Sequence, residues 1–357
     1  MQIPMKVIPG YFNSKPGIQV STWLQDGEVT VHDDDSVELD PKGVQFLQQL
    51  GIEWVMIFSI SRINAKIVKN LREALEANGL KLYRVGHSKL HHLYPVVLNL
   101  PNRDEVLDRY LQMITDIGEA GVRYITHSYM GNGMWRSVDK RPIRGGAMAK
   151  YLDFEKPMRS PIVGSPGEAY KLPLSFDREF SVEELWENYY YFIEKLVPVA
   201  EKAGVRIGFH PNDPPVYTFG GIPRPIFGTY EGFKKAIDYA NSPNIGACLC
   251  TGCWLEGGPA VGSTPKEFIR YFGSRKKLFK LHVRNVVGTL DQKGGFAETY
   301  PNDGYGDVVK IAETLREVGF DGCIMNDHLA PMVGGDRVSA AFQTAYLEGL
   351  VDAVNHR

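Results

Sequence analysis

The sequence predicts an α/β protein of the (β/α)8 barrel class. Eight short apolar runs of strand character alternate with eight longer segments of helical pattern. Parallel strands need crossover helices, so this alternation favours a parallel sheet, and eight units favour closure into a barrel. The length of 357 residues fits one barrel with insertions. A doubly wound open sheet is the alternative, but no G-x-G-x-x-G pattern follows the first run, so the usual dinucleotide-binding interpretation does not apply.

The expected strands are short runs rich in β-branched and aromatic residues. In chain order they are 5–12, 54–60, 80–86, 123–130, 205–210, 245–250, 278–285 and 322–327. The expected helices show helical spacing of apolar residues. They are 41–50, 63–78, 103–120, 181–204, 229–241, 264–272, 305–319 and 336–355. The helix 181–204 has the clearest limits, since Ser181-x-x-Glu184 is a capping-box pattern and Gly204 is a typical stop signal.

The connection from Gly131 to Phe180 is unusually long, at about fifty residues rich in Gly, Pro, Arg and Lys. A loop that follows a barrel strand lies on the active-site face. We therefore expect a single domain over 1–357 that carries an insertion, 131–180, acting as a lid. A mobile insertion without a catalytic role is the alternative.

The composition is that of an ordinary soluble globular protein, with 43% hydrophobic and 23% charged residues and a formal net charge of −2. This balance gives no reason to expect nucleic acid or a membrane as a partner. The first residues lack a basic region and a long apolar stretch, so we expect no signal peptide. The four cysteines do not resemble a disulfide framework, which favours a cytoplasmic protein. A homo-oligomer is an open option.

Four residues of metal-ligand type lie at the ends of consecutive expected strands. His210 ends the fifth, Cys250 the sixth and Asp327 the eighth, while His282 lies late in the seventh. Barrel enzymes carry their chemistry at this edge, and two imidazoles, a thiolate and a carboxylate suit a divalent transition metal. Each residue alone has an ordinary structural explanation, as a satisfied histidine, a small apolar cysteine or a helix cap. Their convergence favours a metal site.

The segment CLCTGC, residues 248–253, also allows a local structural zinc site. The remaining cysteine, Cys323, lies in another expected strand and has no CxxC partner. Strand alternation places Cys248 and Cys250 on one face, with Cys250 nearer the catalytic edge.

Further candidates surround this cluster. Arg284 shares a face with His282, so its guanidinium could clamp a substrate carboxylate, although a core salt bridge explains it equally well. His328 directly follows Asp327 and suits proton transfer near neutral pH, with a structural or surface histidine as the alternative. Asp213 could orient a ligand, bind a hydroxyl or cap a turn. The segment 124–136 offers a polar and aromatic mixture that suits sugar binding or, alternatively, buried packing: His127, Tyr129, Asn132, Trp135 and Arg136.

The segments FHPNDPP, LCTG, LHVRNV, FAET and NDHLAP, in this order, resemble the motif series of the D-mannonate dehydratases. These are manganese-dependent barrels of the xylose-isomerase-like superfamily that convert an aldonate into a 2-keto-3-deoxy acid. The resemblance covers most of residues 100–357. It implies His210, Cys250, His282 and Asp327 as ligands of Mn²⁺ and His328 as the proton-transfer residue. Thiolate ligation by itself would favour Zn²⁺ or Fe²⁺, with Co²⁺ as a further option.

The sequence departs from the family pattern at three places. Asn212 replaces an aspartate, Ala297 replaces a histidine, and the loop after His328 lacks the tyrosine that the family places there. Tyr300 and Tyr129 are candidates to replace it. We therefore expect a metal-dependent dehydratase acting on a sugar acid, for which D-mannonate is a poor substrate. The alternatives are a sugar isomerase or epimerase of the same superfamily and a non-catalytic sugar-binding barrel.

Overall fold

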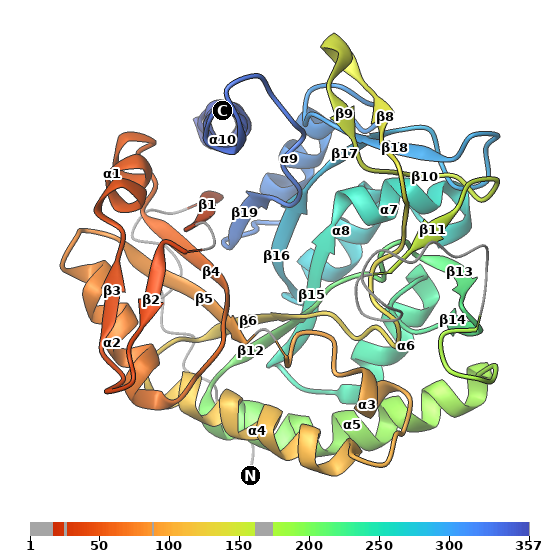
Figure 1. Ribbon diagram of the computed structural model, residues 1–357, viewed down its shortest axis with the longest axis horizontal. Coiled ribbons are helices and arrows are strands. Elements are labelled where there is room, and N and C mark those ends of the chain that lie inside the picture. The colour runs from red at the N-terminus through yellow and green to blue at the C-terminus, as the bar shows by residue number, and fades with distance from the viewer. Residues whose placement is uncertain (1–16, 25–26, 88, 161–173, 357) are drawn as a thin grey trace.

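Eight parallel strands form the centre of the molecule (Figure 1). The computed structural model describes residues 17–24, 27–87, 89–160 and 174–356. In chain order the strands are β1 (Gln19–Leu24), β4 (Trp54–Ile60), β5 (Lys81–His87), β6 (Tyr124–His127), β12 (Arg206–Phe209), β15 (Ile245–Cys250), β16 (Leu278–Val283) and β19 (Cys323–Asn326).

The hydrogen-bonded order of these strands is β5-β4-β1-β19-β16-β15-β12-β6. The two end strands, β5 and β6, lie side by side without forming a ladder, so the barrel is nearly closed with one seam. The predicted α/β barrel is confirmed. Seven of the eight expected strands match these elements closely, while the expected strand 5–12 lies outside the described residues. The first described barrel strand is β1, which the sequence analysis did not identify.

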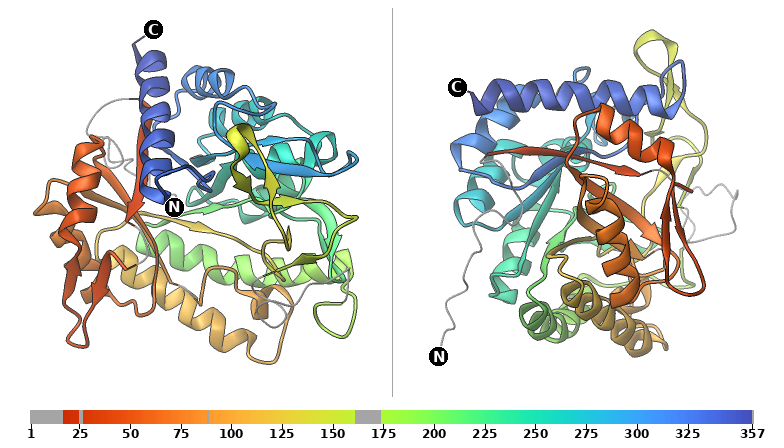
Figure 2. Two further views of the ribbon diagram at one scale, coloured as in Figure 1. Left: turned by 45° about the horizontal axis from the view of Figure 1, so that its top comes forward. Right: turned by 90° about the vertical axis from the view of Figure 1, so that its left-hand side faces the viewer.

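Helices surround the barrel, and Figure 2 shows α10 on one side of it and the α4 and α5 pair on the opposite side. The α-helices are α1 (Pro41–Gln49), α2 (Ala65–Glu76), α3 (Tyr94–Val97), α4 (Arg103–Glu119), α5 (Val182–Ala203), α6 (Tyr230–Ala240), α7 (Thr251–Gly257), α8 (Pro265–Ser274), α9 (Val308–Glu317) and α10 (Asp336–Asn355). Helix α5 begins and ends as its sequence predicts. The Ser181 hydroxyl accepts from the Glu184 amide at 3.1 Å, and Gly204 takes the left-handed conformation at φ 64°.

The main apolar core lies between the strands and these helices. Leu71, Ile114, Phe192 and Leu249 are fully buried there, and each such side chain contributes about 1.5–3 kcal/mol by leaving water. The inside of the barrel is more polar, because Ser21, Thr22, Arg84, Thr126 and Lys280 are also buried. Ser21 and Thr22 are both buried in β1 and interrupt its apolar run, which explains why QVSTWL has no continuous apolar pattern.

The described part of the insertion, residues 131–160, is packed against the barrel's catalytic edge. It contains β7 (Arg136–Ser137), β8 (Arg141–Pro142), the 3-10 helix η1 (Arg144–Gly146), β9 (Met148–Ala149), β10 (Tyr151–Leu152) and β11 (Met158–Arg159). Strand β10 pairs with β18 (Phe296–Thr299), which in turn pairs with β17 (Asn285–Val287). A second apolar cluster that includes Trp135, Leu152 and Phe296 holds this layer in place. In its described part, the insertion therefore forms a wall of the site. The closure of the insertion as a lid stays a prediction.

Smaller elements complete the fold: β2 (Val29–Val31) paired with β3 (Val37–Leu39), β13 (Val216–Phe219) paired with β14 (Ile222–Arg224), and the 3-10 helix η2 (Gly258–Val261). All four cysteines are buried and free of disulfide bonds. Within the described ranges, none of the helices combines the length and the apolar character that crossing a membrane requires.

Candidate functional site

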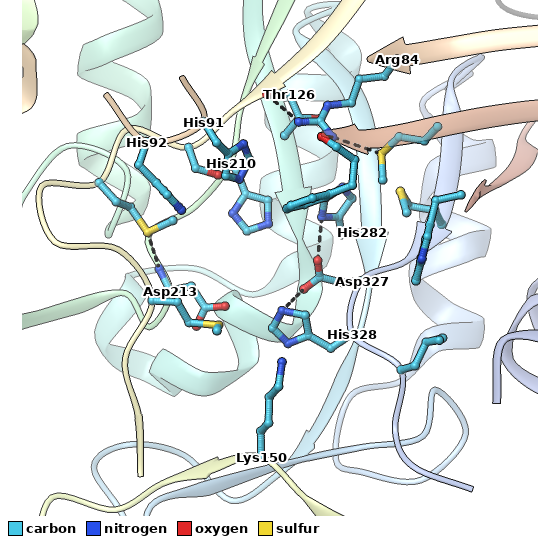
Figure 3. A pocket seen from close by; sticks show the side chains of 18 of the residues that line it. Arg84, His91, His92, Thr126, Lys150, His210, Asp213, His282, Asp327 and His328 are labelled. Atoms are coloured by element: carbon cyan, nitrogen blue, oxygen red, sulfur yellow. Dashed lines mark hydrogen bonds and ion pairs between the residues drawn. The ribbon is translucent and has the colours of Figure 1, made fainter. Parts of the chain in front are cut away.

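Four potential metal ligands meet at the carboxyl ends of adjacent strands. His210 directly follows β12, Cys250 ends β15, His282 is in β16, and Asp327 directly follows β19. One ligand atom from each lies within 4.8 Å of the others, and Cys250 and His282 are paired across the β15–β16 ladder. Figure 3 shows His210, His282 and Asp327 around the inner end of a pocket. The parallel sheet thus brings together residues that are up to 117 positions apart, from 210 to 327.

Each of the two histidines has a ring nitrogen that the protein backbone does not use. The Nδ1–H of His210 donates to the Pro211 carbonyl at 2.8 Å, which leaves Nε2 as the free nitrogen. Neither ring nitrogen of His282 forms a hydrogen bond, although Nδ1 lies 3.1 Å from Asp327 Oδ1. Burial lowers the pKa of His282 to about 3, so this imidazole is neutral. A buried imidazole with two unused nitrogens is well suited to binding a cation.

The two acidic members of the cluster are held in their charged forms. Burial raises the pKa of Cys250, but a hydrogen bond from Cys253 and the positive charge of Arg284 outweigh it and lower the pKa below its usual value. The pKa of Asp327 is well below its usual range, because the positive charge on Arg284 and contacts with His328 and His282 outweigh the effect of burial. The donor set therefore fits a divalent metal ion.

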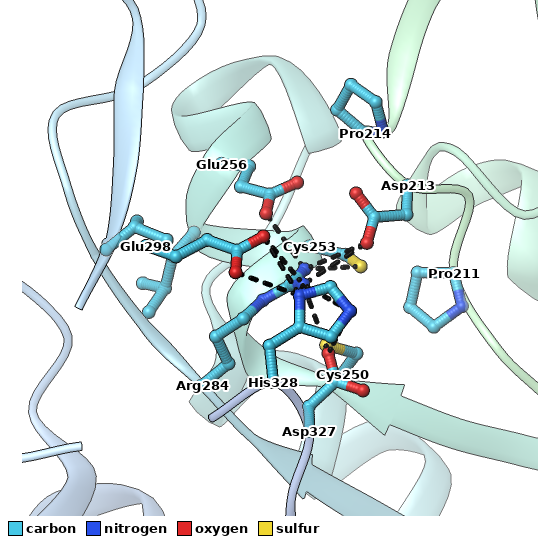
Figure 4. Close-up of polar contacts among 12 residues, drawn as sticks. Pro211, Asp213, Pro214, Cys250, Cys253, Glu256, Arg284, Glu298, Asp327 and His328 are labelled. Carbon is cyan, nitrogen blue, oxygen red and sulfur yellow. Dashed lines mark hydrogen bonds and ion pairs between the residues drawn. The ribbon is translucent and has the colours of Figure 1, made fainter. Parts of the chain in front are cut away.

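Two buried arginines, Arg136 and Arg284, are surrounded by carboxylates, and Figure 4 shows those around Arg284. The Arg284 side chain is 1% exposed and lies within 3.4 Å of carboxylate oxygens of Asp213, Glu256, Glu298 and Asp327. Arg136 pairs with the first three of these at 2.5–3.0 Å. Gly252 allows this packing, since a Cβ there would lie 2.0 Å from Arg284 Nε. Buried charges need such pairing, so the network fixes the carboxylates in position.

His328 is held by one of these carboxylates. Its Nδ1 lies 2.9 Å from both oxygens of Glu298 and 2.5 Å from Nη1 of Arg284, so a carboxylate and a guanidinium together hold this side of the ring. Its Nε2 is 4.0 Å from Asp327 Oδ2. The His328 side chain is 23% exposed, compared with 10% for His282 and 13% for Asp327. It lines the pocket. The arrangement leaves Nε2 available for proton transfer.

The pocket has a volume of about 750 Å³, within the range of small-molecule sites. One side carries His210, His282, Asp327 and His328. Further lining residues come from the first four barrel strands, the segments that follow β5 and β6, and the insertion: Trp23, Met56, Phe58, Arg84, His91, His92, Thr126, Ser128, Met130, Met134 and Lys150. Asp213, Met325, Leu329 and Asp336 complete the lining.

Sequence reasoning missed several of these polar residues. Arg84 stands inside an apolar strand, and Glu298 lies in the quoted FAET segment without having been assigned a role. His91 and His92 lie in the loop that follows β5, the third barrel strand. Their position after a barrel strand is the signal that could have identified them. Lys150 comes from the insertion and enters the pocket lining through the pairing of β10 with β18.

The hypothesis that Arg284 clamps a substrate carboxylate does not fit this structure. Its guanidinium is occupied by protein carboxylates and does not line the pocket, so the alternative of a core salt bridge describes it. Arg136 is buried in the same network and is likewise not positioned for sugar binding. Asp213 does line the pocket, but both of its oxygens contact these arginines, which leaves it a positioning role.

The aromatic candidates for sugar binding are also placed elsewhere. His127 packs against the rings of Tyr110, Phe192 and Phe209, and Tyr129 stacks on Phe192. Trp135 belongs to the apolar cluster beneath the insertion. These three side chains are at least 97% buried and are not part of the pocket lining. Burial in the core outweighs the polar character of the segment, so the alternative of packing is correct for them.

Neither tyrosine considered as a replacement for the family's tyrosine reaches the pocket. Tyr129 is buried among aromatic rings, and the Tyr300 hydroxyl donates to the Pro331 carbonyl at 2.6 Å. Neither is among the lining residues.

The fold and site define a TIM barrel with a candidate metal centre at its carboxyl edge. The family described as D-mannonate dehydratase (UxuA) matches residues 58–357, and the chain belongs to this family. It is therefore a hydro-lyase of the sugar acid dehydratase class, as the sequence predicts. This class is metal-dependent, and the four-residue cluster is a possible site for the ion.

Individual relatives agree with this assignment. The chain is 27% identical to a mannonate dehydratase of Thermotoga neapolitana over 320 residues, covering 81% of this chain and 85% of the relative. It is 28% identical to that of Brachyspira hyodysenteriae over 319 residues, covering 80% and 86%. Among solved structures, mannonate dehydratase from Streptococcus suis serotype 2 matches with a TM-score of 0.76 and 20% identity over 96% of this chain and 95% of that chain.

More distant structures share the barrel alone. An L-ribulose 3-epimerase matches with a TM-score of 0.59 and 11% identity, covering 95% of this chain and 96% of that chain. A xylose isomerase domain protein from Planctomyces limnophilus gives 0.60 and 14%, covering 96% and 100%. These matches support the fold class.

Proposed function

We propose that this protein removes water from an aldonate with His328 as the proton-transfer residue and a divalent metal ion bound beside it. The observation that carries the proposal is the placement of His328 in one pocket with His210, His282 and Asp327, while Glu298 holds its Nδ1. A base with one fixed nitrogen and one free nitrogen next to a cation site is what an elimination next to a carboxylate requires.

The metal would be held by His210, Cys250, His282 and Asp327. When bound, a divalent ion supplies a Lewis acid that stabilises negative charge developing on substrate oxygens. Mn²⁺ is proposed from the resemblance to the family, while the thiolate donor makes Zn²⁺, Fe²⁺ and Co²⁺ the alternatives.

The protein's own groups account for the proton movements. His328 Nε2 accepts the proton from the carbon next to the substrate carboxylate, and Glu298 stabilises the imidazolium that results. The same nitrogen then gives its proton to the departing hydroxyl, so that water leaves from the neighbouring carbon. The enol that remains becomes a 2-keto-3-deoxy acid, and the overall change is the loss of one water molecule.

Product analysis tests this proposal. The purified protein, loaded with Mn²⁺, is incubated with a panel of hexonates and pentonates that includes D-mannonate, and 2-keto-3-deoxy acids are measured. We expect one acid to be dehydrated and D-mannonate to be a poor substrate, because Ala297 and the loop after His328 depart from the family. Efficient D-mannonate turnover, on the order of 1–1000 per second, would contradict this substrate prediction.

The alternative functions have different signatures in the same experiment. An isomerase or epimerase returns the proton, so in deuterated water it gives an isomeric product carrying solvent deuterium and no deoxy acid. A sugar-binding barrel binds its ligand without metal and without turnover. Either result would overturn the dehydratase proposal.

We also propose a cytoplasmic location, which is consistent with the free cysteines and is tested by cell fractionation. We further propose a homo-oligomer, which light scattering tests.

A further inference from the structure

Arg84 is a buried cation of the pocket with no acidic partner. It lies in β5, is 2% exposed and contributes to the pocket lining. Among the described residues, no aspartate or glutamate forms an ion pair with it, whereas Arg136 and Arg284 each contact at least three carboxylates. Burying a charge without a partner is costly, so an uncompensated guanidinium at a pocket wall favours an anionic ligand.

The protein contacts of this guanidinium are long and incomplete. Its Nη1 lies 3.3 Å from the Phe58 carbonyl and 3.5 Å from the Met56 sulfur, and its Nη2 lies 3.5 Å from the Thr126 carbonyl. Its Nε has no hydrogen-bond partner. Good hydrogen bonds of this type are about 2.9 Å long. Arg84 therefore keeps donor capacity for a group that enters the pocket.

The space around the guanidinium is kept open by a glycine. A Cβ at Gly86, two residues further along β5, would lie 3.0 Å from Arg84 Nη2 and 2.5 Å from the Phe58 carbonyl. Any larger residue there would displace the arginine or the neighbouring strand. Another residue of the same pocket, His92, offers a second unused polar atom, since its Nδ1 is buried without a hydrogen-bond partner.

Arg224 provides an internal comparison. It is also buried without a carboxylate partner among the described residues, but it lies outside this pocket. Its guanidinium donates to the Pro214 and Gly133 carbonyls and to Asn132 Oδ1. The donors of Arg224 are thus used to hold loops together, whereas those of Arg84 face the pocket with weaker partners.

We propose that Arg84 binds the carboxylate of the substrate and selects sugar acids over neutral sugars. This inference rests on the proposed function and adds the residue that recognises the acid group. Figure 3 shows Arg84, Thr126, His210 and His282 among the side chains of one pocket, so one small ligand can contact both the guanidinium and the candidate metal site. A planar guanidinium matches a carboxylate with two parallel hydrogen bonds.

The test compares charged and neutral ligands in the wild type, Arg84→Met and Arg84→Lys. Binding of D-mannonate, D-gluconate, D-mannose and D-glucose is measured by calorimetry, and KM and kcat are measured on the acid that the wild type dehydrates. We expect Arg84→Met to weaken acid binding and raise KM about 10- to 100-fold, as loss of a charged hydrogen bond does. Neutral sugars should bind unchanged, and Arg84→Lys should recover part of the loss.

Two further variants separate binding from folding. Arg224→Met should lower the free energy of unfolding while keeping the preference for acids. Gly86→Ala should weaken acid binding in the same direction as Arg84→Met, since its methyl group displaces the guanidinium, so the proposal stays testable if Arg84→Met does not fold. Mannose 6-phosphate serves as a phosphate probe, and tighter binding than D-mannonate would overturn the assignment to a carboxylate.

The outcomes distinguish this proposal from the proposed function. If the wild type dehydrates a sugar acid while Arg84→Met keeps the same KM and affinity, the role of Arg84 is wrong and the dehydratase stands. An equal loss of acid and neutral ligands would also overturn the role. If the wild type neither binds nor dehydrates any sugar acid, both proposals are wrong.

Discussion

The Nδ1 of His328 lies 2.9 Å from each oxygen of Glu298, although the two residues are thirty positions apart and belong to different loops of the site. Glu298 is itself in contact with Arg136 and Arg284. Its contact with His328 and the charges of these two arginines outweigh burial and hold the pKa of Glu298 well below the usual range, so it stays a carboxylate. The orientation of the imidazole thus depends on a buried set of charges that does not touch the pocket directly.

Replacing Glu298 with glutamine should therefore reduce kcat with little change in KM. The amide keeps the approximate shape but cannot stabilise an imidazolium as a carboxylate does, and we expect a loss of roughly 100-fold or more. Steady-state kinetics and metal analysis of Glu298→Gln check this. Unchanged kcat with full metal would show that the contact is structural.

His328→Asn should retain the metal and lose turnover. Asparagine removes the basic nitrogen while keeping some hydrogen bonding, and loss of general acid–base catalysis typically costs about 100- to 10,000-fold in rate. The paired measurement is metal content and kcat on the acid that the wild type accepts. Loss of metal would make His328 a ligand instead, and near-normal turnover would leave it without a catalytic role.

One divalent metal ion per chain should bind through the four-residue cluster. Elemental analysis of protein purified without chelator should give a one-to-one ratio in the wild type and almost none in the Cys250→Ser, His282→Ala double variant. Cys248→Ser is the matched control, because Cys248 is buried in the same strand and lies outside the cluster. Stoichiometric metal in the double variant would disprove the ligand set.

The stability of the protein should fall on acidification partly because of His127. Burial lowers its folded-state pKa to about 3, while an unfolded histidine titrates near 6.5. Below pH 6.5 the unfolded chain binds a proton that the folded chain does not, so stability is full above this pH and declines toward pH 3. Between pH 7 and pH 5 this single group costs about 2 kcal/mol.

His127→Phe should remove this part of the pH dependence, because the side chain already packs among aromatic rings. Urea unfolding at pH 7 and pH 5 measures the difference in the free energy of unfolding. The variant should lose less stability than the wild type over this interval. An equal loss in both proteins would mean that His127 does not titrate in the unfolded state as assumed.

The fold and the four potential ligands could be predicted from the sequence because they follow simple periodic rules. Strand ends of a parallel barrel meet at one edge, so His210, Cys250, His282 and Asp327 could be placed together without coordinates. Strand β1 could not be recognised, because its buried Ser21 and Thr22 break the apolar pattern.

The roles of the arginines could not be predicted for a different reason. Arg136 and Arg284 come from segments nearly 150 residues apart, and both insert into the same group of carboxylates. Their partners depend on side-chain packing beneath the pocket, which spacing along the chain does not encode. The same holds for Arg84, whose position in an apolar strand resembles a core residue rather than a ligand-binding one.

The seam between β5 and β6 has a consequence for how this barrel responds to its ligand. The Arg84 side chain belongs to β5 and reaches the Phe58 carbonyl in β4 and the Thr126 carbonyl in β6, so it bridges the one place where the ring of strands has no ladder. A molecule that binds this guanidinium also tethers the two edges to each other. Occupancy of the pocket and rigidity of the scaffold are then coupled through a single side chain at the seam.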